Sequence, residues 1–285
     1  MDFINLLFSP DNLFLRQSLL VGIFSSVVFG IIGTYVISRR ISYLAGAVSH
    51  SVLGGIGGVL WLKSVFAIEW LEPLYGALAA ALVAAFIIAR FGYGYGSDSG
   101  GKREEIMIGA TWAIGMALGI IFIDMTPGYF DITSYLFGDI LLVSSRDLIL
   151  IIILDMVVVL FFTRFYHTIT AICFDEEFAR LRGLRVDLFH QLLLGLTAVS
   201  VVLLIRIVGI VMVVAMLTLP TATAALYTRT LAGMMLLAVL ISAFTIVLGI
   251  GISYSANLSS GPAIILCAGI VYFTSAILKS RRFSL

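Results

Sequence analysis

The stretch Cys173-Phe-Asp-Glu-Glu-Phe-Ala-Arg-Leu-Arg-Gly-Leu-Arg-Val-Asp187 is strongly charged, yet it lies between two long apolar runs. Within it, Phe174, Phe178 and Leu181 are spaced at i, i+4 and i+7, which predicts a short helix with one apolar stripe. Gly183 then supplies a plausible C-terminal stop. A short amphipathic helix between two membrane spans either lies on the membrane surface or serves as a handle for another protein.

The rest of the chain has the composition of a membrane protein. Of its 285 residues, 61% are hydrophobic and 12% are charged, and the mean hydropathy is +1.14. A helix needs about 20 apolar residues to cross a bilayer, and these runs lack the alternating pattern of β-barrel strands. We therefore predict an all-α polytopic membrane protein with a single transmembrane domain over residues 1–285.

Nine spans are expected from the apolar runs, although the sixth and seventh could form one long broken helix and reduce the number to eight. Their expected ranges are 17–38, 43–62, 72–90, 105–124, 147–165, 188–206, 208–227, 232–252 and 261–279.

The basic residues predict how the chain is oriented, because cytoplasmic loops carry an excess of Lys and Arg. With nine alternating spans, one side holds all but four of the 17 Lys and Arg. The four on the other side are Arg16, Lys63, Arg146 and Arg206. This bias predicts that the N-terminus is outside, and that the C-terminus and the Cys173–Asp187 helix are cytoplasmic.

Several classes of function are disfavoured. The net charge of +1 implies no nucleic-acid partner, and the two cysteines form no disulfide framework. The segment Gly96–Arg103 approaches a phosphate-binding P-loop, but Arg103 stands where the motif needs Ser or Thr. If ATP supplies the energy for this chain's function, we therefore expect that the chain does not itself bind the ATP.

Ionisable residues inside the spans are the first candidates for function, because burying them in a bilayer is costly. His50 lies in Ser49-His50-Ser51, just before a glycine-rich run, and imidazole is a common transition-metal ligand. It could equally be hydrogen-bonded between helices. Asp155 lies in mid-span and could pair with a basic group or line a path, with pairing favoured. His167 and His190 lie near cytoplasmic helix ends, where a solvated or headgroup-facing role is expected.

Four segments in order carry a resemblance to a known family. They are Arg39–His50, with a double basic step before a helix that bears Ser-His; Ser134–Val143; Val208–Ala224; and Gly261–Leu266. Together they resemble the ABC-transporter permeases that import zinc, manganese and iron in bacteria, and the resemblance covers nearly the whole chain. In that family Ser134–Val143 would be an outer re-entrant helix.

The resemblance implies a fold similar to the vitamin B12 importer permease, in a bacterial cytoplasmic (inner) membrane. It also implies a transport subunit that is not an enzyme and binds no cofactor, with ATP hydrolysed on a separate subunit. The implied partners are ATP-binding-cassette ATPase subunits, an extracytoplasmic metal-binding protein and a second permease copy, either identical or paralogous. The helix at about 173–185 would be the coupling helix that docks on the ATPase. Its expected docking residues are Phe174, Glu176, Glu177, Phe178, Arg180, Leu181 and Arg182.

The chain departs from the family beside His50. Members that carry manganese or zinc usually have Asp four residues earlier, whereas this chain has Gly46. The transit site is therefore His50 alone, or Asp155 or another group completes it, or the substrate differs. Since imidazole suits zinc and carboxylate suits manganese, the expected cargo is a divalent transition metal, with zinc favoured over manganese or iron. The alternatives are a permease for a metal chelate or another small solute, and a secondary transporter that needs no ATP.

Overall fold

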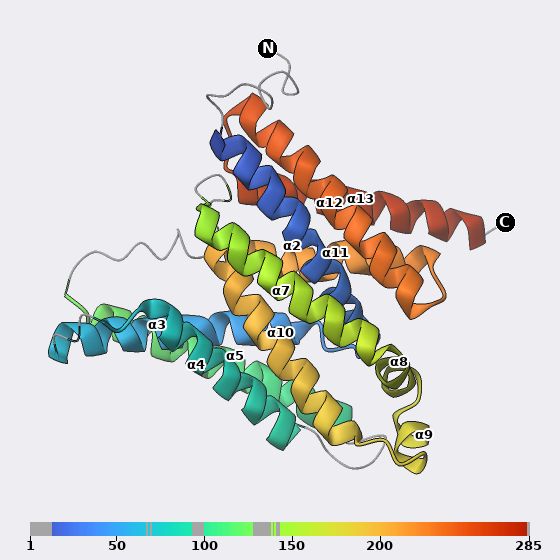
Figure 1. Cartoon of the computed structure of the whole chain (residues 1–285), viewed down its shortest axis with the longest axis horizontal. Helices are drawn as coiled ribbons and strands as arrows, with labels where there is room; N and C mark the ends of the chain where they lie inside the picture. The colour runs from blue at the N-terminus through green and yellow to red at the C-terminus, as the bar shows by residue number, and fades with distance from the viewer. Residues whose placement is uncertain are drawn as a thin grey trace. The chain divides into compact units, whose positions relative to one another are not determined.

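A computed structural model describes residues 13–66, 68, 70–92, 100–127, 138, 140 and 143–283. Throughout that part of the chain the regular structure is helical and includes no strand, as the sequence predicts (Figure 1). The helices are α2 (Leu13–Ser38), α3 (Tyr43–Phe66), α4 (Pro73–Ile87), η1 (Ile88–Gly92), α5 (Gly100–Asp124), α7 (Ser145–Arg164), α8 (Tyr166–Phe174), α9 (Glu176–Leu181), α10 (Val186–Val208), α11 (Ile210–Tyr227), α12 (Leu231–Ala256) and α13 (Ser260–Phe283).

Eight helices in the described residues are long and apolar enough to cross a membrane. The number becomes nine if α7 and α8, which are bent by 72° at their junction, count as one span. α10 and α11 qualify separately, so the single broken helix considered for them is not what forms. Gly209, with φ +81°, joins the two, a backbone conformation that glycine adopts without steric cost.

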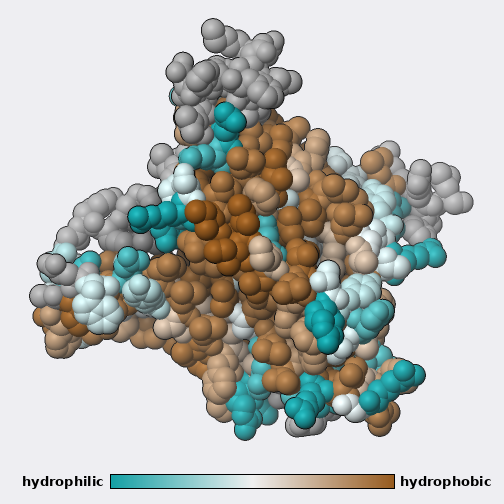
Figure 2. All heavy atoms as spheres, in the orientation of Figure 1, coloured by the Kyte–Doolittle hydropathy of each residue, from teal (hydrophilic) through white to brown (hydrophobic). Residues whose placement is uncertain are grey.

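The helix bounds agree with the predicted spans, and each predicted span corresponds to a long helix. The expected re-entrant helix at 134–143 lies outside the described residues except for single positions. Exposed apolar side chains cover the outer face of α7, as expected where a helix faces lipid; Figure 2 shows them over the part of the surface where α7 lies. The chain is therefore a multi-pass membrane protein.

The chain divides into two compact units. The first contains residues 1–40, 133–173 and 203–285. Here α2 packs against α12, where a Cβ added to Gly22 would come within 2.5 Å of Ile246. α7 starts beside the start of α2, because Gln17 donates a hydrogen bond of 3.0 Å to Ser145.

The second unit contains residues 41–132 and 174–202. α3 packs against both α4 and α5, and glycines line both contacts, which allows the backbones to approach closely. Gly55 faces Gly76 of α4, while Gly54 and Gly57 face Gly115 and Gly119 of α5. Residue numbers in these contacts increase together along both helices, so α3 and α5 run in the same direction.

Candidate functional site

His50 lies on α3 against the aromatic side chain of Trp112, which the sequence analysis did not select. The indole of Trp112, on α5, stacks on the imidazole with ring centroids 4.8 Å apart and an interplanar angle of 16°. His50 is partly buried, and its Nδ1 is buried without a hydrogen-bond partner among the described residues. The stack, and not a hydrogen bond, therefore fixes the orientation of the ring.

Gly46 lies one helical turn before His50, on the same face of α3. A Cβ added there would come within 2.6 Å of Cζ3 and 2.9 Å of Cη2 of Trp112. Real Cβ atoms do not approach other atoms so closely, so any side chain at position 46 would have to displace the indole. A side chain at position 46 and the indole of Trp112 in its present position therefore exclude each other.

Few other ligand groups accompany His50. No cluster of three or more His, Cys, Asp and Glu side chains that could hold a metal ion occurs within the described ranges. The nearby hydroxyl of Ser51 donates to the carbonyl of Ala47 at 2.8 Å. The imidazole of His50 thus remains the principal ligand group that this unit offers at that place.

Asp155 lies in α7 of the first unit, 8% exposed. Neither carboxylate oxygen has a hydrogen-bond partner in the part of the chain that the structure describes, so the basic partner expected for it is not found there. Asp147, at the start of the same helix, differs: it forms a capping box with Ser144 and lies 3.3 Å from Nε of Arg206. A role for Asp155 as a metal ligand stays a prediction.

The predicted charged helix forms, but it is shorter than expected. Cys173 and Phe174 end α8, and the six-residue α9 begins after Asp175, whose carboxylate accepts a 2.9 Å hydrogen bond from the Phe178 amide. Gly183 ends α9 with φ +78°, as predicted. The break occurs at Asp175 because a side-chain cap there starts a new helix.

The polar residues of α9 divide into two groups. Arg180 makes ion pairs within its own unit, 2.6 Å to Asp187 and 3.3 Å to Glu176. Its hydrogen bond to Asp187 raises the pKa of Arg180. Glu177 and Arg182 are exposed, and the Arg182 guanidinium lies 4.6 Å from the centre of the Phe178 ring. Arg180 therefore holds α9 to the start of α10 through Asp187, while its pair with Glu176 lies within α9. Glu177 and Arg182 are left as outward-facing polar groups.

The apolar residues of this segment are unusually exposed for their size. Phe174 is 70% exposed, Phe178 48% and Leu181 87%, whereas Ala179 is buried. The stripe predicted from the sequence therefore faces away from the unit. Such a surface suits a handle for another protein or contact with headgroups.

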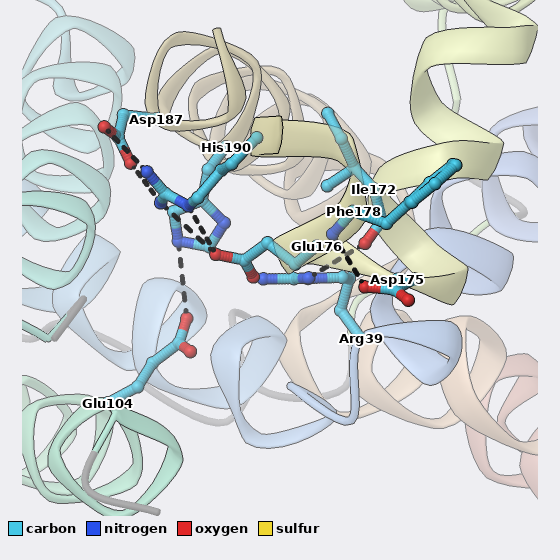
Figure 3. Close-up of polar contacts among 9 residues, drawn as sticks. Arg39, Glu104, Ile172, Asp175, Glu176, Phe178, Asp187 and His190 are labelled. Carbon is cyan, nitrogen blue, oxygen red and sulfur yellow. Dashed lines mark hydrogen bonds and ion pairs between the residues drawn. The ribbon is translucent and has the colours of Figure 1, made fainter. Parts of the chain in front are cut away.

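The exposure of His167 agrees with the expected solvated or headgroup-facing role, whereas the same expectation is wrong for His190. His167 is exposed, but His190 is 1% exposed, and its Nε2 lies 3.5 Å from Glu104 Oε1 (Figure 3). The sequence places His190 near a helix end. It does not show that the start of α5 lies beside this part of α10.

A polytopic all-helical protein with a short, exposed, charged helix between spans agrees with the arrangement that the sequence resemblance implies. The chain matches the ABC 3 transport family over residues 11–279 and belongs to that family. The resemblance inferred from the sequence is thus confirmed.

Relatives and a solved structure agree with this assignment. A "Probable metal transport system membrane protein" of Chlamydia muridarum is 34% identical, over 97% of this chain and 92% of the relative. The "Manganese transport system membrane protein MntC" of Listeria monocytogenes is 32% identical, over 94% and 92%. The structure "PsaBC from Streptococcus pneumoniae in complex with Fab" matches with a TM-score of 0.79 and 32% identity, over 96% of this chain and 94% of that one. These bacterial membrane relatives agree with the predicted location in a bacterial inner membrane.

Proposed function

We propose that this chain is the membrane permease subunit of an ATP-binding-cassette importer that moves a divalent transition metal ion into the cytoplasm. The observation that carries the proposal is membership of the ABC 3 transport family over nearly the whole chain, together with relatives named for metal and manganese transport. This membership favours a permease over the ATP-independent secondary transporter that the sequence left open. ATP would be hydrolysed by separate subunits, and an extracytoplasmic binding protein would deliver the ion.

The exposed surface of α9 is the proposed docking site for the ATPase. Phe178 and Leu181 would enter an apolar groove on that subunit, and Glu177 would supply a charged contact at the rim. The fixed position of Arg180 supports this assignment, because a handle that transmits force must be held firmly by its own chain. Lipid headgroups remain the competing occupant for the same stripe.

The docking test combines Glu177→Arg with Phe178→Asp. We expect metal uptake to be lost while the protein remains in the membrane and no longer co-purifies with the ATPase. Arg185→Glu is the control, because Arg185 is exposed in the loop after α9 and the change reverses a charge outside the proposed docking stripe. Normal ATPase association in the double variant would contradict the docking site.

His50 is the proposed transit ligand. In a permease dimer with two-fold symmetry, one residue per chain gives a matched pair, and two imidazoles hold an ion weakly enough to release it. His50→Ala should abolish the uptake of zinc and manganese, whereas His167→Ala should leave both unchanged. Uptake that survives His50→Ala would remove His50 from the path.

A further inference from the structure

Trp112 occupies the place where a second ligand from α3 would stand. Gly46 and His50 share one face of α3, so a side chain at 46 could reach an ion held on His50. The six-membered ring of Trp112 fills that space, 2.6 Å from where a Cβ would lie. Trp112 in this position therefore leaves no room for a carboxylate side chain at position 46.

Close packing of the α5 backbone on α3 places Trp112 beside Gly46 and His50. Gly115 lies one turn further along α5, and a Cβ there would come within 2.6 Å of the Cα of Ser51. At Gly57 a Cβ would lie 2.8 Å from the carbonyl oxygen of Gly119. Because α5 lies directly against α3 at these points, the indole is held over Gly46 and the imidazole.

The stack replaces an interaction that metal-binding histidines usually have. A ligating imidazole is normally oriented by a hydrogen bond from its second nitrogen, but the described residues offer no such partner to Nδ1 of His50. Trp112 holds the ring instead. Its π face also favours the positive charge that a bound ion places on the imidazole.

Resting on the metal-import function proposed above, we propose that Trp112 is a specificity-determining residue. It keeps oxygen ligands out of position 46 and leaves a nitrogen site backed by an aromatic ring. Nitrogen donors bind Zn²⁺ more tightly than Mn²⁺, and carboxylates are what Mn²⁺ prefers. The transporter therefore selects zinc over manganese, and Gly46 and Trp112 must change together to reverse the choice.

The test measures zinc and manganese uptake separately, in cells that carry the permease variants with their ATPase and binding protein. The wild type should take up zinc in preference. Trp112→Leu should weaken the apparent affinity for zinc by about tenfold, the effect typical of losing a group that orients a ligand, while Trp112→Phe should retain most of it. Trp61→Leu is the control, because Trp61 contacts Phe122 on the same pair of helices.

The decisive variant combines Gly46→Asp with Trp112→Ala. Relative to Trp112→Ala alone, we expect the ratio of manganese to zinc uptake to rise by about tenfold or more. If the double variant does not fold, Gly46→Ala provides a second test. It keeps both His50 and Trp112, but its Cβ would push the indole away from its present position. It should therefore weaken zinc uptake as Trp112→Leu does. A wild type that prefers manganese, or a zinc-to-manganese ratio unchanged in all these variants, would overturn the inference.

A binding measurement separates this inference from the proposed function. In purified protein with Trp61→Phe and Trp70→Phe, added Zn²⁺ should change the fluorescence of Trp112, and His50→Ala should abolish that change. If His50→Ala stops uptake while the Trp112 variants keep the wild-type ratio of zinc to manganese uptake, only the role of Trp112 in selectivity is wrong. If uptake continues without His50, the transit site fails as well.

Discussion

At the scale of single residues, two aspartates on α7 have opposite surroundings. Asp155 is buried without a partner among the described groups, whereas the carboxylate of Asp147 accepts hydrogen bonds from Ser144 and pairs with Arg206. Asp155→Asn removes the charge but keeps the shape, so it should raise the melting temperature, by about 2–4 °C for each kcal/mol gained. Asp147→Asn should lower it, since losing a cap costs about 1 kcal/mol.

Thermal unfolding of the detergent-purified protein, followed by a thiol-reactive dye, measures both changes. If Asp155→Asn instead unfolded at a much lower temperature than the wild type, the Asp155 carboxylate would have a stabilising partner outside the described residues. Zinc uptake by Asp155→Asn tests its candidate ligand role separately, because an amide is a far weaker ligand than a carboxylate.

Two helical glycines, one on α3 and one on α5, have very different surroundings. A Cβ at Gly55 would overlap the carbonyl of Gly76, while a Cβ at Gly109 meets nothing within 4 Å. Gly55→Ala should therefore destabilise the protein by about 1–3 kcal/mol through overpacking. Gly109→Ala should stabilise it by about 0.5–1 kcal/mol, because alanine is the better helix residue. Equal melting temperatures for the two variants would contradict the close packing of α3 on α4.

The sequence predicts such residues unequally. His50 and Asp155 could be selected because an ionisable group in an apolar run is conspicuous by itself. Trp112 could not, because an aromatic residue in a membrane span is ordinary until its neighbour is known. The one available signal was the spacing of Gly115 and Gly119, which marks the face of α5 that approaches another helix. The burial of His190 likewise depends on a contact with Glu104, which is distant in sequence.

At the scale of elements, α9 is held by local interactions because six residues cannot form a stable helix alone. Asp175 caps its start, Gly183 ends it, and Arg180 ties it to Asp187 on α10. Asp187→Ala should therefore loosen α9 and reduce metal uptake. Faster hydrogen exchange of the amides in residues 176–184 would show the loosening directly.

Arg182→Ala is the matched control for that experiment. Arg182 follows α9 and is exposed, so its loss should leave hydrogen exchange in the helix nearly unchanged. Protection that is equal in the two variants would mean that the ion pair of Arg180 does not support the helix. Sequence periodicity predicted the exposed stripe correctly, but it extended the helix back to Cys173 because it cannot detect the cap at Asp175.

At the scale of the whole molecule, hydropathy accounts for most of what was predictable. A bilayer leaves a helix no alternative partner for its backbone, so each long apolar run became a helix close to its predicted bounds. The fifth span is the informative exception. α7 carries Arg146, Asp147 and Asp155, and it meets the criteria for a span only together with α8. Polar residues that make internal contacts or have buried positions weaken the hydropathy signal there.

The predicted orientation of the chain in the membrane rests on the distribution of Lys and Arg alone. After Cys173→Ser and Cys267→Ser, single cysteines can be introduced at Lys63, at Arg229 and at Glu177, all of which are exposed. In intact cells a membrane-impermeant maleimide should label Lys63→Cys and spare the other two. Permeabilised cells should label all three, which controls for reactivity. Labelling of Glu177→Cys from outside would place α9 on the wrong side for any ATPase, and the docking proposal would fail with the orientation.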